Sequence, residues 1–572
     1  MNNCPHAGSI SVFQTLCLLD SYFPEFAQGV ADGRYAFWLG SGISRSRFPM
    51  LGDLVIKVLE YLRSRINHDN PNCPFKEALE RAFNIAGLND DERNQVTLDT
   101  VVAEWQIAGI LKQRLSNLYA QFLNIDVAGE ADDLLVWNGI DVVSTYADPN
   151  VEPSAEHFAL AALIKEGMVS ELASANWDAL VEKAVQLTSA GACAIDVCVR
   201  SQDLQAGEFR AKLLKFHGCA VRAAQDEETY RKHIVGRQVQ IDTWRDEPRN
   251  QGMVQHLVTT IMENPTLMLG LSAQDFNIRG LFSQAQNQLA WDWPGERPAC
   301  VFSNDEIGED QRALLANVFR QHYTGQTRSE IQSHVLVRSY ASQLLPALLL
   351  YGLARKLTRI SSMLPMDIPE ELREWVKAKI HDLRNSIAAG CTTDTLSFIL
   401  HLMRQITKCK SLLIEGRSPE DPACFEPITE TAVRNIEDSQ IMRNSGLPEA
   451  AIAAAILSSG SANGLWEIAT TPGDGIGTGM IALVKGDRRT PLYVVTDASA
   501  EHHLFASGHL QESRDAIVVH AKPIHDRLQR SPSRSFAGTS ADRIRRTSIR
   551  TLLDDVTNGE GLTERFTLEA MP

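Results

Sequence analysis

The stretch Tyr35-Ala-Phe-Trp-Leu-Gly-Ser-Gly-Ile-Ser44 constrains the fold more than any other part of this 572-residue chain. An apolar, strand-like run ends in Gly40-Ser-Gly42, and a helical pattern opens near Leu51. A strand, a glycine turn and a helix in this order are typical of the start of a nucleotide-binding α/β domain. Glycines suit the turn because a side chain there would keep backbone amides away from a pyrophosphate. The usual third glycine is replaced by Arg45, so an ordinary tight turn after a buried strand is an equal alternative.

Three later strand-like runs also end in polar groups. They end in Ser174-Ala-Asn-Trp-Asp178, in Lys215-Phe-His-Gly218 and in Gly270-Leu-Ser-Ala-Gln-Asp275. In open α/β sheets, ligands bind at the carboxyl ends of the strands. The four strand ends together therefore predict a single site.

With this order and spacing the chain resembles the sirtuin (silent-information-regulator) superfamily over roughly residues 30 to 340. The matching elements are the Gly-x-Gly-x-Ser opening, Asn-x-Asp after a strand, Lys-x-His-Gly, and a late Gly-x-Ser strand. The ending Gly270-Leu-Ser-Ala-Gln-Asp275 is most similar to the branch found in bacterial antiphage-defence proteins. The resemblance implies an α/β fold with a Rossmann-like parallel sheet and helical insertions. Beyond about residue 360 the resemblance ends, and the helical and strand-like patterns there predict a separate α+β C-terminal domain.

The expected division of the chain has three parts: a helical segment at residues 1–29, a sirtuin-like NAD-binding domain at 30–360, and a C-terminal domain at 361–572 for assembly or partner binding. Within these parts, periodicity predicts helices over 51–67 and 154–166, one long helical pattern over 97–125, and a hairpin of 480–485 with 492–496. His157, near the start of the second helix, is more often structural than catalytic in such a place. Three further stretches are expected to be irregular: a loop or linker at 418–427, a mobile glycine-rich loop at 470–479 and an Arg-rich solvated segment at 527–550.

Composition describes an ordinary globular protein, with 44% hydrophobic and 22% charged residues. The net charge of −16 makes direct attraction to nucleic acid unexpected, so any nucleic-acid contact is indirect at most. The ten cysteines include no Cys-x-x-Cys pair, and no signal peptide or bilayer-length apolar run is evident; a cytoplasmic protein without a membrane partner is expected. Protein-deacylating sirtuins carry a zinc module on two such pairs. No metal is therefore expected, and the resemblance points toward NAD hydrolysis.

The resemblance assigns a role to each candidate residue. His217 would be the general base and Asn176 would position the attacking water. Asp275 would hold a ribose, because a carboxylate accepts two hydrogen bonds from a diol, although capping the next helix is an equal alternative. The remaining NAD-binding set is Gly40, Ser41, Gly42, Ser44, Asp178, Gly270 and Ser272, with Asp178 also able to cap a helix.

The favoured function is an NAD glycohydrolase that releases nicotinamide and ADP-ribose, with NAD as substrate. The resemblance implies NAD depletion during phage infection, restrained by homo-oligomerisation or by a companion such as an ATPase or translocase until a phage-derived trigger arrives. Three alternatives remain open: a non-catalytic sensor of NAD or ADP-ribose, a zinc-free protein deacylase, and a nucleic-acid-processing protein centred on the Arg-rich segment.

Overall fold

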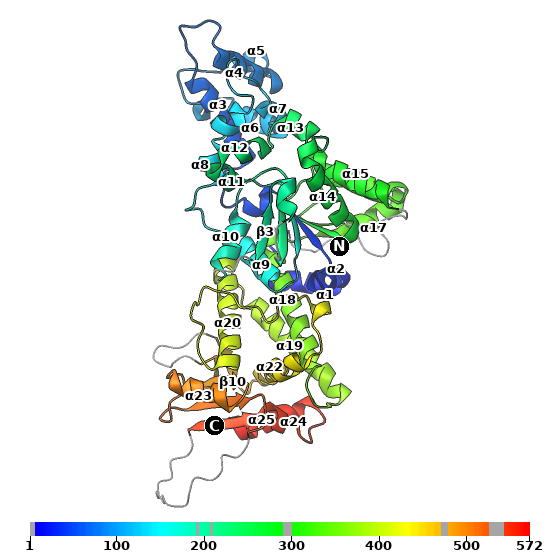
Figure 1. Ribbon diagram of the computed structural model, residues 1–572, viewed down its shortest axis with the longest axis vertical. Helices are drawn as coiled ribbons and strands as arrows, with labels where there is room; N and C mark the ends of the chain where they lie inside the picture. The colour runs from blue at the N-terminus through cyan, green and yellow to red at the C-terminus, as the bar shows by residue number, and fades with distance from the viewer. Residues whose placement is uncertain are drawn as a thin grey trace, which may run out of the picture.

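The structure is a computed structural model that describes residues 6–189, 194–205, 210–289, 300–470, 479–524 and 543–571. These parts form an elongated molecule, with a helical lobe at one end, one sheet in the middle and a second sheet at the other end (Figure 1). Most of the predicted glycine-rich loop 470–479 and the first part of the Arg-rich segment 527–550 lie outside the described residues.

The central sheet has seven strands in the order β3-β4-β2-β1-β5-β6-β7, and every neighbouring pair is parallel. This confirms the predicted Rossmann-like parallel sheet. The strands are β1 (Ala36–Leu39), β2 (Glu171–Ser174), β3 (Ile195–Cys198), β4 (Ala211–Lys215), β5 (Thr266–Leu269), β6 (Cys300–Ser303) and β7 (Leu336–Val337).

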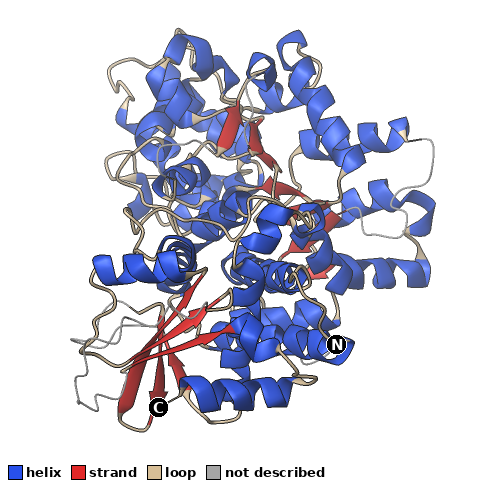
Figure 2. Cartoon of the chain, turned by 60° about the horizontal axis from the view of Figure 1, so that its bottom comes forward, coloured by secondary structure: helices blue, strands red, loops and turns tan. Residues whose placement is uncertain are grey.

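Helices cover both faces of this sheet (Figure 2). Alternate residues of a strand point to opposite faces, so Phe37 and Leu39 pack into one core and Trp38 into the other. The first layer contains α1 (Val12–Ser21), α2 (Pro24–Ala31), α9 (Ala155–Lys165), α10 (Leu180–Leu187) and α18 (Ala341–Ser361). The second contains α14 (Gln251–Glu263), α15 (Phe276–Gln288), α16 (Glu309–Phe319) and α17 (Gly325–Val335).

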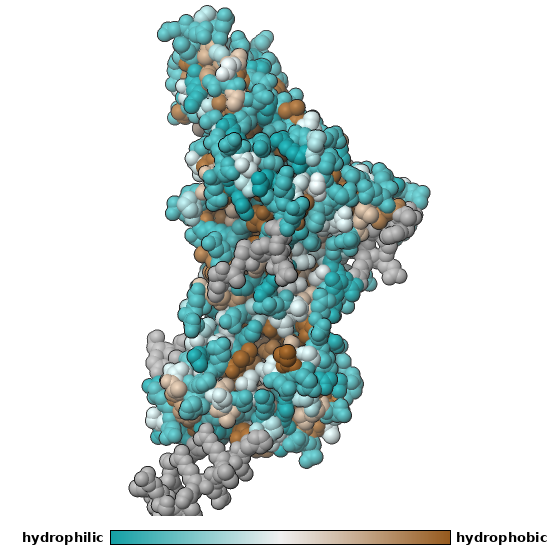
Figure 3. All heavy atoms as spheres, in the orientation of Figure 1, coloured by the Kyte–Doolittle hydropathy of each residue, from teal (hydrophilic) through white to brown (hydrophobic). Residues whose placement is uncertain are grey.

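The helical lobe has its own core and a mostly hydrophilic visible surface (Figure 3). It contains α3 (Leu51–Ser64), α4 (Pro74–Ile85), α5 (Asp90–Arg93), α6 (Ala108–Asn117), α7 (Tyr119–Leu123) and α8 (Val142–Tyr146). The prediction of one continuous helical pattern over 97–125 is wrong. Trp105 has extended backbone, and its buried indole donates to the carbonyls of Thr97 and Thr100, at 2.9 and 3.2 Å, which holds a turn there.

The second sheet has five strands in the order β12-β11-β10-β9-β8, antiparallel from β8 to β10 and parallel from β10 to β12. This confirms the separate α+β region. Its strands are β8 (Glu467–Ala469), β9 (Ile481–Lys485), β10 (Arg488–Val495), β11 (Ala516–His520) and β12 (Ile544–Ser548). The predicted hairpin is present, but its second strand begins at Arg488 and not at Leu492, because the turn needs only Gly486 and Asp487.

The helices of the C-terminal part pack on this second sheet and on the first layer of the central one. They are α19 (Glu370–Ala389), α20 (Thr395–Glu415), α21 (Gln440–Asn444), α22 (Leu447–Ala462), α23 (Ala498–Ala506), α24 (Ile549–Leu553) and α25 (Gly559–Ala570). The expected division at residue 360 falls at the end of α18, which contacts α1, α2 and α9 on one side and α19 and α22 on the other.

A buried ion pair joins the two parts at α18. The Nζ of Lys356 donates to a carboxylate oxygen of Glu166 at 2.6 Å and to the carbonyl of Thr429 at 2.8 Å, and both charged side chains are fully buried. The stretch 418–427, predicted as a linker or surface loop, is irregular and mostly exposed, and it is anchored by Phe425, which is 1% exposed and whose amide donates to the carbonyl of Thr188. The hydrophobic core therefore runs from the first helix layer into the C-terminal helices.

Candidate active site

The four strand ends singled out in the sequence belong to four adjacent strands, β4, β2, β1 and β5. All four are parallel, so their carboxyl ends lie on the same edge of the sheet. The chain runs from β1 to β2 on one side and reaches β5 on the other side of β1. Such a reversal of strand order opens the crevice in which α/β sheets bind ligands.

The glycines of this edge are required by the close packing of two loops. A Cβ on Gly40 would lie 2.4 Å from the carbonyl oxygen of Gly270, and one on Gly42 would lie 2.6 Å from its Cα. Gly270 itself has φ +61°, and a Cβ there would lie 2.5 Å from the Ile43 nitrogen. The amides of Gly40 and Gly42 donate to the carbonyls of Leu269 and Gly270, both at 3.0 Å. The close packing of the two loops therefore explains why glycine is required at these positions. Ser41 lies between Gly40 and Gly42, is exposed, and does not donate its amide to either of these two carbonyls.

Asn176 is half-buried and reaches across to the first loop. Its Nδ2 donates to the carbonyl of Gly40 at 3.0 Å, and its own amide donates to Oγ of Ser174 at 3.1 Å. Asp178 is buried and accepts from the amide of Leu180 at 3.1 Å, at the start of α10. Asp178 therefore accepts from the first amide of α10, although the N-cap residue itself is Ala179, and Asn176 links its own loop to the Gly40 loop.

Ser44, assigned to NAD binding, is 2% exposed and lies under the site, where its hydroxyl bonds to Asp178. Its Oγ also lies 3.2 Å from Nε2 of His157. The Nδ1 of His157 accepts from the amide of Ser154 at 3.2 Å and lies 2.8 Å from its hydroxyl, so the ring donates through Nε2 to Ser44. Burial lowers the pKa of His157 to about 4, which keeps the ring neutral.

His217 is 7% exposed and pairs with the acidic residue of the fourth strand end. Its Nε2 lies 2.8 Å from Oδ2 of Asp275, without the alignment of a hydrogen bond. The other oxygen of Asp275 accepts from the amide of Asn277 at 2.8 Å and caps α15. Burial raises the pKa of Asp275, but the nearby His217 and the Asn277 amide outweigh it and hold that pKa below its ordinary value. Ser272 is exposed and lies on the same loop as Gly270, three residues before Asp275 in the sequence.

The segment after His217 is held against the site by its backbone. Gly218 has φ +95°, and a Cβ there would lie 2.5 Å from the carbonyl oxygen of His233. The amide of Val235 donates to the carbonyl of His217 at 3.1 Å. This segment contains α12 (Glu227–Tyr230) and α13 (Gln238–Thr243).

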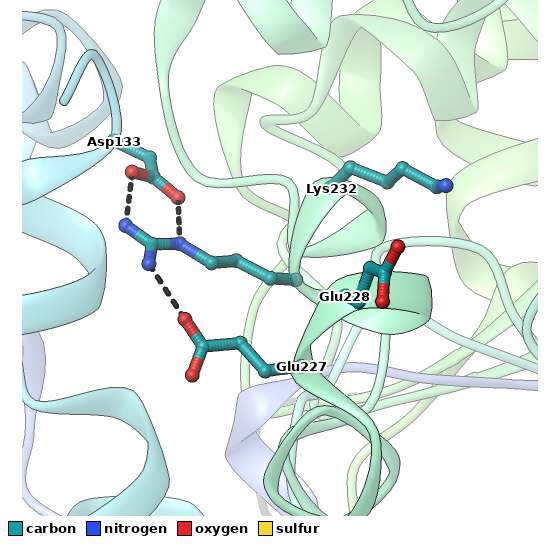
Figure 4. A pocket seen from close by; sticks show the side chains of 5 residues that line it. Asp133, Glu227, Glu228 and Lys232 are labelled. Atoms are coloured by element: carbon teal, nitrogen blue, oxygen red, sulfur yellow. Dashed lines mark hydrogen bonds and ion pairs between the residues drawn. The ribbon is translucent and has the colours of Figure 1, made fainter.

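Arg231 fastens this segment to the helical lobe. Its guanidinium donates to both oxygens of Asp133 and to Glu227, each at 2.7 Å (Figure 4). These residues line a cavity of about 560 Å³ together with Glu228 and Lys232. None of the candidate site residues lines this cavity, so it is separate from the strand-end site.

Two buried polar side chains next to the candidate residues lack partners among the described residues. They are the indole nitrogen of Trp177, between Asn176 and Asp178, and the amide group of Asn277, which is fully buried. Buried polar atoms are almost always hydrogen-bonded, so these two side chains are exceptions within this part of the fold. In the described residues, no group of three or more His, Cys, Asp or Glu side chains is arranged to hold a metal ion.

Two residues that the sequence reasoning did not place in the site are brought to it by the fold. His157 contacts Ser44, which is 113 positions away in the sequence. Lys215 is buried beside the site, at the end of the strand that leads to His217. A histidine after a capping serine and a lysine at the end of an apolar run carry no local signal for such contacts. Only the Lys-x-His-Gly spacing marked Lys215 at all.

No helix within the described ranges is long and apolar enough to cross a membrane. A comparison with curated proteins finds no match. Residues 170–321 match a family model described as SIR2-like domain. The matched region contains Asn176, Asp178, His217, Gly270 and Asp275, and it begins after the β1 loop. The chain therefore carries a SIR2-like domain within its central parallel-sheet region, which is consistent with an enzyme that uses NAD.

Proposed function

We propose that the chain is an NAD glycohydrolase, which converts NAD and water to nicotinamide, ADP-ribose and a proton. The observation that carries the proposal is the pairing of His217 with Asp275 on the sheet edge that also carries Asn176, in a SIR2-like region. The nicotinamide–ribose bond breaks through an oxocarbenium-like state, and the leaving pyridinium becomes neutral nicotinamide. The protein must hold the substrate and deliver water to the ribose carbon, which is work for a base and a positioning group.

His217 is the general base in this proposal. It takes a proton from the attacking water or from a ribose hydroxyl, and Asn176 orients that water. One oxygen of Asp275 is committed to the cap of α15 and the other meets His217. Asp275 therefore orients the imidazole first, and a ribose diol would share the second oxygen with it.

The proposed NAD-binding residues follow the same geometry. Exposed Ser41 and Ser272 lie on the two loops that pack through Gly40, Gly42 and Gly270, and the pyrophosphate binds along this junction. Ser44 and Asp178 support the loops from below, since both are buried.

The wider role that we propose is NAD depletion during phage infection, by a homo-oligomer or with a companion protein that restrains it. An enzyme that destroys a central cofactor needs such restraint. The support for this role is the similarity of the Gly270–Asp275 strand ending to that of antiphage-defence proteins.

The test is to incubate the purified full-length chain with NAD and separate the products. Nicotinamide and ADP-ribose formed without a peptide acceptor support hydrolysis, and Asn176→Ala should lower the rate about 100-fold, as loss of a positioned polar group does. NAD binding without turnover would support a sensor instead. Turnover only with an acylated peptide would support a deacylase.

A further inference from the structure

Lys215, two residues before His217, is a charged side chain without access to solvent. It is 1% exposed, at the end of β4. A buried ammonium group is costly unless several polar groups surround it. Here Nζ donates to the backbone carbonyl of Asp178 and to Oε1 of Glu182 at 2.9 Å, and lies 3.3 Å from Sγ of Cys219.

These three partners lie on three separate parts of the candidate site. Asp178 ends the loop that carries Asn176, Glu182 is in the first turn of α10, and Cys219 precedes α11 (Ala220–Gln225) just after His217-Gly218. A backbone hydrogen bond joins the same two segments: the amide of Ala220 donates to the carbonyl of Trp177 at 2.8 Å. The loop with Asn176 and the strand with His217 are thus fastened together at two points.

The contacts continue from Asp178 toward the first loop. Its carboxylate accepts from the hydroxyl of Ser44, which in turn meets His157 on α9. Burial raises the pKa of Asp178, and the charge of Lys215 opposes this rise. Burial alone would lower the pKa of Lys215, but its interactions with Cys219, Glu182 and Asp178 raise that pKa above its ordinary value. The ammonium group is therefore charged at neutral pH.

We propose that Lys215 is a positioning residue: its buried ammonium group holds the loop of Asn176 in register with the strand of His217. It touches no reacting atom, and it acts by fixing the distance between the two catalytic groups. This inference rests on the proposed NAD hydrolysis at the same strand ends.

The experiment compares Lys215→Met with the double variant Lys215→Met/Glu182→Leu in the full-length chain. The single variant leaves the Glu182 carboxylate without its buried partner and should unfold at lower urea concentration. The double variant removes that carboxylate as well and should regain most of the stability, because apolar replacements of a buried ion pair are often neutral. Both variants should lose about 100-fold in kcat for NAD, the cost of a misplacement of about 1 Å, with KM within about threefold.

Two further variants sharpen the result. Lys215→Arg keeps the charge and should recover part of the lost kcat. Lys165→Met removes another buried lysine of the same domain and should leave kcat unchanged. Lys165 donates to the carbonyl of Thr188 at the C-terminal end of α10, away from the strand ends.

The proposal is overturned if the folded double variant turns over NAD within about threefold of wild type. It is also rejected if no Lys215 variant folds, because Lys215 is then a residue of general stability. A wild-type chain without NAD turnover is a different outcome, since that result rejects the proposed function itself.

Discussion

Two buried histidine–carboxylate pairs lie at the carboxyl ends of parallel strands, one in each sheet. His217 lies 2.8 Å from Asp275 in the central sheet, and His520 lies 3.0 Å from Glu501 in the second sheet. Both histidines are less than a tenth exposed. On these measures alone the two pairs are equivalent.

Their surroundings differ. Glu501 also accepts from Nε of Arg546 at 2.8 Å, so its two oxygens are taken by two side chains of its own domain. Burial raises the pKa of Glu501, but His520 and Arg546 outweigh it and lower the pKa to about 2. Around His217, by contrast, the ends of four adjacent parallel strands lie on one edge of the sheet, and exposed Ser41 and Ser272 lie on the two glycine loops that pack there.

The difference shows that a His–carboxylate pair at a strand end does not identify an active site. A pair closed by a third charge stabilises a domain. A pair placed where several strand ends and glycine loops converge has room for chemistry.

The largest predicted effect on stability is at the joint between the two sheets. Lys356→Met should lower the free energy of unfolding by about 3–5 kcal/mol, because it leaves the Glu166 carboxylate buried and unpaired. Urea unfolding of the full-length chain measures it. The control is Lys410→Met, which removes a half-buried bond to the carbonyl of Pro427 together with a positive charge that repels Lys356, and should cost at most about 1 kcal/mol. Equal costs would show that the buried pair does not hold the two parts together.

The glycine loops allow a matched comparison of the two sheets. Gly270 and Gly486 have φ of +61° and +58°, so alanine is strained at both, by about 1–2 kcal/mol. At Gly270 the added Cβ also meets the Ile43 nitrogen at 2.5 Å, whereas nothing lies within 4 Å at Gly486. Gly270→Ala should therefore destabilise the chain more and lower NAD turnover, and Gly486→Ala should change stability alone. Normal turnover in folded Gly270→Ala would remove the loop junction from the site.

Mild acid should weaken the network under the first site before it affects Glu501. His157 has its folded pKa, about 4, below the ordinary value of 6.5. The contribution of neutral His157 to the free energy of unfolding is therefore complete above pH 6.5 and declines as the pH falls toward 4. The loss between pH 6.5 and pH 5 is at most about 2 kcal/mol. Glu501, with its pKa depressed from 4.5 to about 2, keeps its contribution above pH 4.5 and loses it only toward pH 2.

The measurement is the melting temperature at pH 7 and pH 5. His157→Asn should make the decline between these values shallower, and exposed His68→Asn should not. Burial also lowers the pKa of His233 to about 4, so part of the fall in melting temperature between pH 7 and pH 5 should remain in His157→Asn. An unchanged slope in His157→Asn would contradict a neutral His157 beneath Ser44.

The smallest predicted effect is that of metal removal. A chelator should leave both NAD turnover and the melting temperature unchanged, because the chain has no Cys-x-x-Cys pair. Stoichiometric zinc in the purified protein, lost together with the fold, would refute this prediction.

Much of the central sheet could be predicted from the sequence because its signals are local. The four strands that lead to the site are short apolar runs, and each ends in glycines or polar residues that mark the carboxyl edge. Lys215 and His157 could not be placed in the same way, since their partners are distant in the chain and come together only through strand order. The turn at Trp105 was missed because the indole bonds that hold it override a helical pattern of apolar residues. The double use of Asp275, as helix cap and partner of His217, also depends on two loops meeting.

The most direct test of the two-pair comparison is NAD turnover by His217→Ala and His520→Ala, each corrected for the folded fraction. Loss of a general base costs about 10²–10⁴-fold, so His217→Ala should lower kcat by that amount. His520→Ala should lower stability and leave kcat within about threefold of wild type. Near-normal turnover in His217→Ala, or an equal loss in both variants, would contradict the assignment of catalysis to the central sheet.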